Sequence, residues 1–231
     1  MAAACALAAM VVAGSLWRWP PPLERVRDRT AVDPSRTAAV ATTLGLARIP
    51  GMASAMLASL TVLASVDILV AYLPAYGEEH GIGVRTVGLL LATQAASSMT
   101  ARALMLPLLR LLGRRWLLAS SMITTACALA VLPMAGARTP LLFGLMACAG
   151  VGLGLGQPVT MSWVVGRAPT AARATALGLR ITANRLGQVV LPAAVGVLAG
   201  AAGVSAIFVA VGAMLTASGG LVLRAGFGNE P

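Results

Sequence analysis

The sequence predicts an all-α integral membrane protein: six transmembrane helices in one bundle, preceded by a partial helix and a basic cytoplasmic linker. Its composition is 58% hydrophobic and only 10% charged, whereas soluble domains carry about 25% charged residues. Uncharged apolar segments, long enough to cross about 30 Å of hydrocarbon, recur between short charged turns. All 17 basic residues are arginines. Their strong bias towards one side of the predicted topology is typical of a polytopic membrane protein.

The chain begins with a short apolar segment and a long polar one. Residues 1–16 are apolar but shorter than the roughly 20 residues that a span requires, so we interpret them as part of a transmembrane helix. The arginines follow this segment, which favours a helix whose C-terminal end is cytoplasmic rather than a cleaved signal peptide. Residues 17–50 carry six arginines against three acidic residues and are predicted to be a cytoplasmic basic linker.

Six apolar segments follow and form a predicted bundle over residues 51–224, with residues 225–231 as a cytoplasmic tail. Turns rich in charge or glycine separate them, and the turns alternate between basic and non-basic character. The segments are residues 51–76, 86–109, 116–137, 139–166, 171 to a turn at glycines 200–203, and from there to 224.

Polar residues are concentrated in four of these helices. A charged side chain inside a bilayer costs about 2.5–3.5 kcal/mol on insertion scales, so such groups usually face a bundle interior or a watery cavity. We therefore expect these four helices to line a polar solute pathway, and the uncharged third and sixth helices to face lipid. The candidate lining residues are Asp67, Gln94, Gln157, Arg180, Asn184, Arg185 and Gln188.

The fifth helix carries the densest polar pattern. Arg180, Asn184 and Gln188 recur every four residues and share one face, which Arg185 flanks. At about 1.5 Å per residue, Arg185 lies roughly 16 Å deep, close to the midplane. A guanidinium presents five donors suited to carboxylates or phosphates, so Arg185 is the first candidate to hold an anionic group or a counter-ion.

Asp67 is the single acidic residue inside a predicted span. Two interpretations stay open. It is either a carboxylate for substrate binding or proton coupling, or a structural partner of an arginine or a helix end.

Glycines and a proline shape the fourth helix. Gly150, Gly152, Gly154 and Gly156 make two overlapping GxxxG pairs, which permit close approach of a neighbouring helix. Pro158 removes a backbone hydrogen bond and predicts a bend.

Several functional classes find no support. The net charge of +10 is distributed as membrane topology requires, so we expect no nucleic-acid partner. His80 and the three cysteines make no metal-ligand pattern, and we expect neither metal nor cofactor. No paired carboxylates or nucleophile motif is visible, so the chain is not expected to be an enzyme.

Two stretches resemble a known family. PLLRLLGRRWLL resembles the loop motif between the second and third helices of a major facilitator superfamily bundle, with Gly113, Arg114 and Arg115 at its glycine and basic positions, although Arg110 stands where the motif has an aspartate. GLGLGQP followed by RAPTAARATALGLRITANRLGQVVLP is similar to the fourth-to-fifth helix passage of the C-terminal half, particularly in bacterial drug- and metabolite-type members.

The resemblance implies alternating-access transport of a small solute, coupled to an ion such as a proton or to a substrate gradient, in a bacterial inner membrane. Residues 1–16 then correspond to the end of helix six, so the chain is expected to be a truncated or half-length transporter. It would need a second bundle or a second copy of itself. Gly113, Arg114 and Arg115 would form a cytoplasmic gate loop, with Arg102 pairing near it. The alternative is a non-transporting membrane interaction subunit or an inactive fragment.

Overall fold

The computed structural model describes residues 45–46, 49 and 51–224. The predicted helix remnant at residues 1–16, all but three residues of the linker at 17–50, and the tail at 225–231 lie outside this range.

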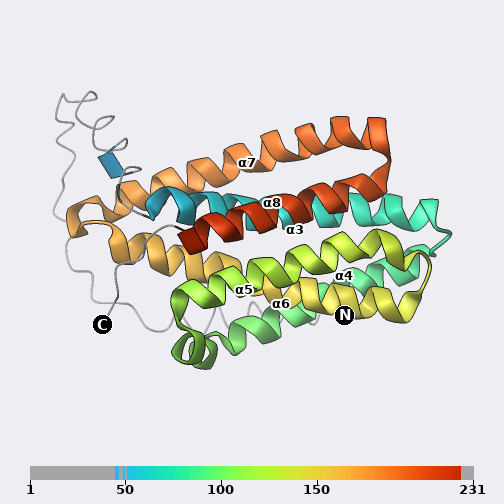
Figure 1. Ribbon diagram of the computed structural model, residues 1–231, viewed down its shortest axis with the longest axis horizontal. Helices are drawn as coiled ribbons and strands as arrows, with labels where there is room; N and C mark the ends of the chain where they lie inside the picture. The colour runs from blue at the N-terminus through green and yellow to red at the C-terminus, as the bar shows by residue number, and fades with distance from the viewer. Residues whose placement is uncertain (1–44, 47–48, 50, 225–231) are drawn as a thin grey trace, which may run out of the picture. The chain divides into compact units, whose positions relative to one another are not determined.

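Six long α-helices make up nearly all of the described chain (Figure 1), which confirms the all-α prediction. A short 3₁₀ turn, Thr170–Ala172, precedes the fifth of them. The helices are α3 (Met52–Glu79), α4 (Val84–Ala103), α5 (Met105–Ala135), α6 (Thr139–Arg167), α7 (Arg173–Ala202) and α8 (Val204–Arg224).

Four of the six helices, α3, α5, α6 and α8, are long and apolar enough to cross a membrane. The other two, α4 and α7, have sufficient length but carry several polar side chains, among them Arg102 of α4 and Arg180 of α7. The two helices with the most polar sequences, α4 and α7, are thus less hydrophobic than a typical membrane-spanning helix.

The helices α3 and α6 occupy the middle of the bundle. The helix α6 packs against α3, α4 and α5, whereas α3 packs against α6, α7 and α8. The helices α5 and α8, which carry arginines only near one end, pack extensively against each other. The helix α4 makes most of its contacts with α6, and α7 makes more contacts with α3 than with any other helix. These two polar helices therefore each keep a broad face without a partner helix in the described bundle.

The glycines of α6 allow its three neighbours to approach closely, as the GxxxG spacing predicts. A Cβ at position 154 would lie 2.6 Å from the Ser98 carbonyl oxygen of α4, and one at position 156 would lie 2.8 Å from Val62 of α3. A Cβ at Gly152 would overlap Thr125 of α5. Successive glycines of this run face different helices, so the run permits close packing of α6 against α3, α4 and α5.

Two chain reversals fall at glycines with positive φ. Gly203, with φ of 80°, separates α7 from α8 at the turn that the sequence predicts near residues 200–203. Gly136, with φ of 54°, ends α5. Residues with a Cβ rarely adopt such angles, so glycine is required at both points.

The boundary between α4 and α5 differs from the prediction. The second helix ends at Ala103 rather than near Leu109, and residues 105–112 form a separate helical stretch before the backbone breaks at Gly113. Pro107 explains the early end, because it has no N–H to donate to the carbonyl of Ala103 four residues earlier. The predicted loop is therefore a short helix followed by a turn.

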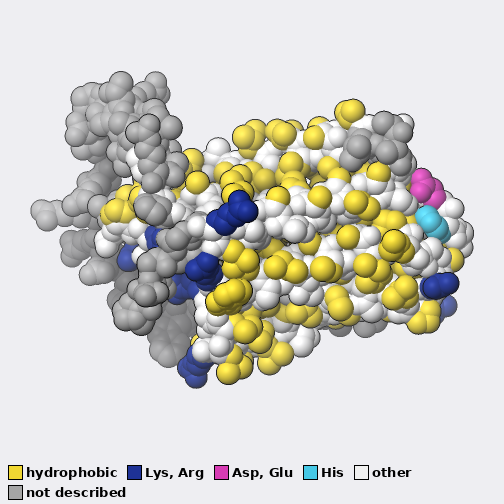
Figure 2. Space-filling view, viewed as in Figure 1, with side chains coloured by type: hydrophobic (Ala, Val, Ile, Leu, Met, Phe, Trp, Pro, Cys, Tyr) yellow, Lys and Arg dark blue, Asp and Glu magenta, His cyan; other side chains and the backbone are white. Residues whose placement is uncertain are grey.

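On the face that Figure 2 shows, charged side chains gather towards the two ends of the bundle, and apolar side chains are spread over the surface between them. One end carries the C-terminal ends of α4, α6 and α8, and it holds most of the arginines. The opposite end holds Glu78, Glu79, His80, Arg85 and Arg138. This distribution matches the predicted alternation of basic and non-basic turns, and we call the first end the basic end.

The glycine packing gives a direct test on α6. We expect Gly154→Ala to lower the free energy of unfolding by about 1–3 kcal/mol, because the added methyl group collides with the α4 backbone. The matched control is Gly144→Ala on the same helix, where an added Cβ meets nothing within 4 Å. Thermal unfolding of the purified variants in detergent measures the difference. Equal stabilities of the two variants would contradict the packing.

Candidate functional site

A buried arginine joins the three helices α3, α6 and α7. The Arg180 side chain is only 7% exposed, and its Nη2 donates to the Gln157 side-chain oxygen at 2.7 Å, to the Gln157 carbonyl at 3.2 Å and to the Thr160 hydroxyl at 3.1 Å. Gln157 in turn donates to the Ser59 carbonyl of α3 at 2.8 Å. All of the acceptors that Arg180 contacts are neutral oxygens, so its positive charge is solvated by dipoles rather than cancelled by a carboxylate.

This cluster retains unused hydrogen-bonding capacity. Nε of Arg180, Oδ1 of Asn184 and the hydroxyl of Ser59 are buried and have no hydrogen-bond partner among the described residues. Asn184 is 6% exposed and lies one turn beyond Arg180 on the same face of α7. Buried polar groups are usually hydrogen-bonded, so such atoms in a native fold call for a partner from water or a ligand.

A second polar chain connects α7 with α3. Arg185 Nη1 donates to Gln188 Oε1 at 3.0 Å, and Gln188 Nε2 donates to the Asp67 carboxylate at 2.7 Å. Asp67 is eight residues, or about 12 Å of helix, along α3 from Ser59. The acid therefore belongs to a separate group, away from the basic end, and Gln188 is its direct partner.

The helix α4 contacts α6 through side chains that donate to backbone carbonyls. Gln94 donates to the Ser98 hydroxyl at 3.3 Å, and this hydroxyl donates to the Gly150 carbonyl at 2.8 Å. One turn further on, Arg102 Nε donates to the Gly154 carbonyl at 3.2 Å. Pro158 has no N–H with which to satisfy that carbonyl, so Arg102 replaces the hydrogen bond that the proline removes.

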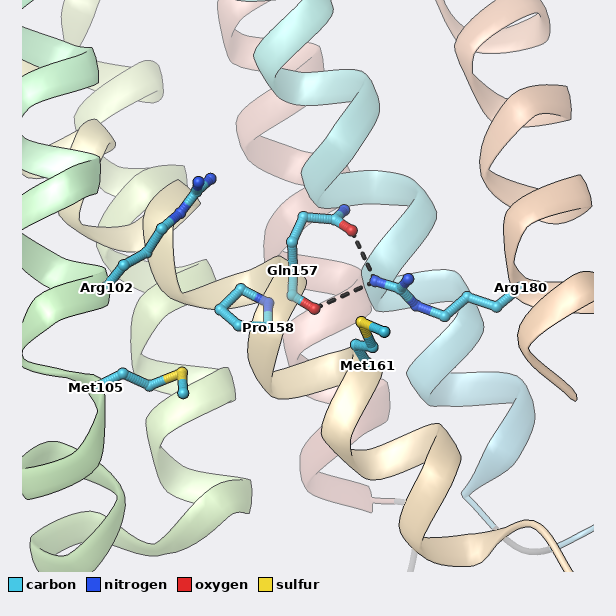
Figure 3. Close-up of a pocket in the computed structure, with 6 residues that line it drawn as sticks. All are labelled: Arg102, Met105, Gln157, Pro158, Met161 and Arg180. Atoms are coloured by element: carbon cyan, nitrogen blue, oxygen red, sulfur yellow. Dashed lines mark hydrogen bonds between the residues drawn. The ribbon is translucent and has the colours of Figure 1, made fainter. Parts of the chain in front are cut away.

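Arg102 and Arg180 line one cleft of about 280 Å³ from opposite sides (Figure 3). The lining is completed by the Gln157 and Pro158 side chains and by two methionines, Met105 and Met161. It draws on α4, on the start of α5, on α6 and on α7. Two cationic groups and three apolar side chains therefore share a small cleft that contains no acidic lining residue.

The predicted gate loop lies at the basic end. Gly113 has φ of 71° and ψ of 161°, a conformation accessible essentially only to glycine. Arg115 donates to the Leu223 carbonyl in the last turn of α8, where a cation is favourable. The Arg114 guanidinium lies beside Gly166 near the end of α6. The two arginines thus connect this turn with the ends of two other helices.

The structure brings the predicted lining residues into three groups rather than one. The first group consists of Arg180, Asn184 and Gln157. The second group consists of Asp67, Gln188 and Arg185. Gln94 lies with Ser98 where α4 contacts α6. Arg185 is exposed and lies outside the cleft, so the guanidinium that lines the cleft from α7 is Arg180. Arg102 lines the same cleft, and its described partner is the Gly154 carbonyl rather than the gate loop.

Sequence reasoning missed the hydroxyl and backbone partners. Ser59, Ser98 and Thr160 are buried hydroxyl residues on α3, α4 and α6. Their positions facing the predicted polar residues could have identified them only once the helix packing was known. The two methionines of the cleft have no sequence signal, because methionine is common in apolar helices.

These features define a class: a multi-pass helical membrane protein whose polar groups lie on an otherwise apolar bundle. Residues 55–231 match the family description "Major Facilitator Superfamily". The chain belongs to this superfamily of membrane transporters, as the two sequence motifs indicate.

Solved structures show the same fold. The proton:xylose symporter XylE bound to 6-bromo-6-deoxy-D-glucose superimposes with a TM-score of 0.58 at 13% identity, covering 80% of this chain and 45% of that one. The inward open xylose transporter XylE from E. coli gives a TM-score of 0.57, also at 13% identity, with 80% and 47% covered. The chain thus spans about half the length of the solved structures that it matches. No curated protein sequence matches it significantly.

The contact between Arg102 and the carbonyl left free by Pro158 can be tested by a double-mutant cycle. We expect Arg102→Met to destabilise the native protein by about 0.5–1.5 kcal/mol, and to cost much less in a Pro158→Ala background, where the restored N–H satisfies the Gly154 carbonyl. Unfolding of the four proteins in detergent measures the coupling. An equal cost in both backgrounds would contradict the proposed replacement.

Proposed function

We propose that the chain transports a small solute by alternating access, and that the polar residues of α3, α4, α6 and α7 form one wall of the solute pathway. The observation that carries this proposal is the cleft between Arg102 and Arg180, which places a buried and incompletely hydrogen-bonded guanidinium beside an open volume. Intramembrane charges of this kind usually mark solute or ion pathways.

The orientation proposed from the arginine bias places the basic end of the bundle, and with it the C-terminal end of α8, in the cytoplasm of a bacterial cell. Cytoplasmic turns of polytopic proteins are enriched in arginine and lysine. The cleft is then in the cytoplasmic half of the bundle, because Arg102 lies in the last turn of α4.

A second bundle is proposed to complete the pathway. Large apolar side chains are exposed on the two helices that lack a partner on their outer face, with Met99 of α4 at 72% and Val189 of α7 at 70%. The site groups lie on these helices and on α3 and α6. A facing bundle, supplied by further polypeptide or by a second copy, would cover the apolar surface and enclose the solute. Transport sites of this kind lie between two such repeats.

Flux in vesicles tests the proposal. Purified protein reconstituted with a mixture of labelled amino acids, organic acids and cationic drugs is expected to give protein-dependent, gradient-sensitive flux. Well-inserted protein without any flux would instead favour the alternative of an interaction subunit or fragment.

Arg185→Ala is expected to abolish this flux while membrane insertion is retained. The arginine holds Gln188, which in turn holds Asp67, so its loss frees the second polar group. Arg173→Ala is the matched control, since it removes an exposed arginine from the first turn of the same helix. Unchanged uptake by the Arg185 variant, at equal protein per vesicle, would exclude this role.

Asp67→Asn tests coupling to a proton. If the carboxylate carries the coupling proton, the neutral amide keeps the size of the side chain but removes its titration. We expect gradient-driven accumulation to be lost and exchange of solute across the membrane to continue. Glu79→Gln, at the exposed end of α3, is the control. Accumulation at the native level by the Asp67 variant would assign the acid a structural role.

A further inference from the structure

We propose that the cleft between Arg102 and Arg180 binds a small organic anion: a carboxylate attached to a short apolar group. This inference rests on the proposed function, because it assigns a substrate class to the same pathway. It follows from the donors that the two arginines leave unused, from the absence of a competing acid, and from the size and lining of the cleft.

Arg102 has spare donors on its guanidinium. Its Nε is occupied by the Gly154 carbonyl, whereas its two terminal nitrogens have no hydrogen-bond partner among residues 51–224. The bond through Nε restrains the plane of the guanidinium group. Figure 3 shows the Arg102 side chain on the side of the cleft opposite Arg180. A fixed guanidinium with free terminal nitrogens is preorganised for two parallel hydrogen bonds to a carboxylate.

Arg180 has spare donors on its other side. Only its Nη2 is engaged, with Gln157 and Thr160, while Nε is buried without a partner in the described part of the chain. The side chain is more than nine-tenths buried and still lines the cleft. Gln157 is itself held by the Ser59 carbonyl, so the arginine is fixed in position before a ligand arrives.

No acidic side chain within the described helices neutralises this pair. Asp67 accepts a hydrogen bond from Gln188, at about 12 Å of helix from Ser59. The acidic residues Glu78 and Glu79 lie at the end of the bundle opposite the basic end. Two guanidiniums without an acid in the cleft favour binding of an anion over a cation or a neutral sugar.

The rest of the lining favours an organic anion over an inorganic one. Met105, Pro158 and Met161 provide an apolar surface, and methionine adapts its shape to varied apolar ligands. The volume of about 280 Å³ lies just below the range of about 300–1,000 Å³ typical of drug-sized ligands. A carboxylate with a few methylene groups contacts both the two arginines and the apolar side chains of the cleft. Phosphate contacts the arginines but leaves the apolar side chains uncovered.

Equilibrium binding tests this assignment without any transport. The full chain in phosphatidylcholine nanodiscs is equilibrated with labelled hexanoate, and hexylamine, hexanamide and inorganic phosphate are used as competitors. We expect saturable hexanoate binding that unlabelled hexanoate displaces and that the other three compounds do not. Addition of phosphatidylglycerol to the nanodiscs separates a free carboxylate from a lipid head group, because a lipid site would lose hexanoate binding.

Variants locate the binding in the cleft. Arg102→Gln and Arg180→Gln should each weaken hexanoate binding about tenfold to a hundredfold, as expected for a lost charge-assisted contact. Arg110→Gln makes the same change of charge at an exposed arginine outside the cleft and should bind like the native protein. Because Arg180→Gln also removes contacts within the bundle, Met161→Trp provides a second variant that fills the cleft without a change of charge and should abolish binding.

The inference would be overturned if hexanoate did not bind, if phosphate or hexylamine competed as well as hexanoate does, or if phosphatidylglycerol displaced hexanoate. It would also be overturned if hexanoate still bound to both the Arg102→Gln and the Met161→Trp variants. Its failure can be told apart from failure of the proposed function. Flux of another solute that hexanoate does not inhibit would overturn the inference alone. Arginine-dependent hexanoate binding without flux would overturn the proposed function alone.

Discussion

Burial of the Arg180 guanidinium is the constraint on which the rest of the polar architecture depends. Placing a charge in an apolar span costs about 2.5–3.5 kcal/mol, and each hydrogen bond to a charged group returns about 1.5–3 kcal/mol. Two or more good acceptors are therefore needed, and α6 supplies them through Gln157 and Thr160. Gln157 then requires the Ser59 carbonyl of α3 for its own amide. One buried charge thus fixes the relative positions of three helices.

The composition of α6 makes this arrangement possible. Its glycines let α4 approach until Ser98 and Arg102 reach the carbonyls of Gly150 and Gly154. Pro158 frees the second of these carbonyls, and the arginine that satisfies it also lines the cleft. The same residues therefore serve packing and the candidate site, because an arginine held by a backbone carbonyl through one nitrogen keeps its other nitrogens available.

Much of the fold could be predicted from the sequence, because bilayer thickness and the positions of charged residues limit where helices begin and end. The six helices follow from these limits, the turn at residues 200–203 follows from its glycines, and the close approach at α6 follows from the GxxxG spacing. The shared face of Arg180, Asn184 and Gln188 follows from helical periodicity. The early end of α4 depends on the missing N–H of Pro107, which the positions of the charged residues do not indicate. The assignment of Arg180 rather than Arg185 to the cleft depends on how α7 is rotated against α6, and periodicity along a single helix does not specify this rotation.

The central claim is that the face formed by α4, α6 and α7 opens to water and attracts anions. Its most direct test is the reactivity of a cysteine at position 161 in a protein whose native Cys5, Cys127 and Cys148 are replaced by alanine. We expect negatively charged, membrane-impermeant thiol reagents to modify M161C faster than positively charged ones of the same size. A protein that retains only Cys127, whose side chain is exposed in the uncharged part of α5, is expected to react with neither reagent. If neither M161C nor Cys127 were modified, or if the cationic reagent modified M161C faster than the anionic one, the proposed water-filled, anion-attracting face would be contradicted.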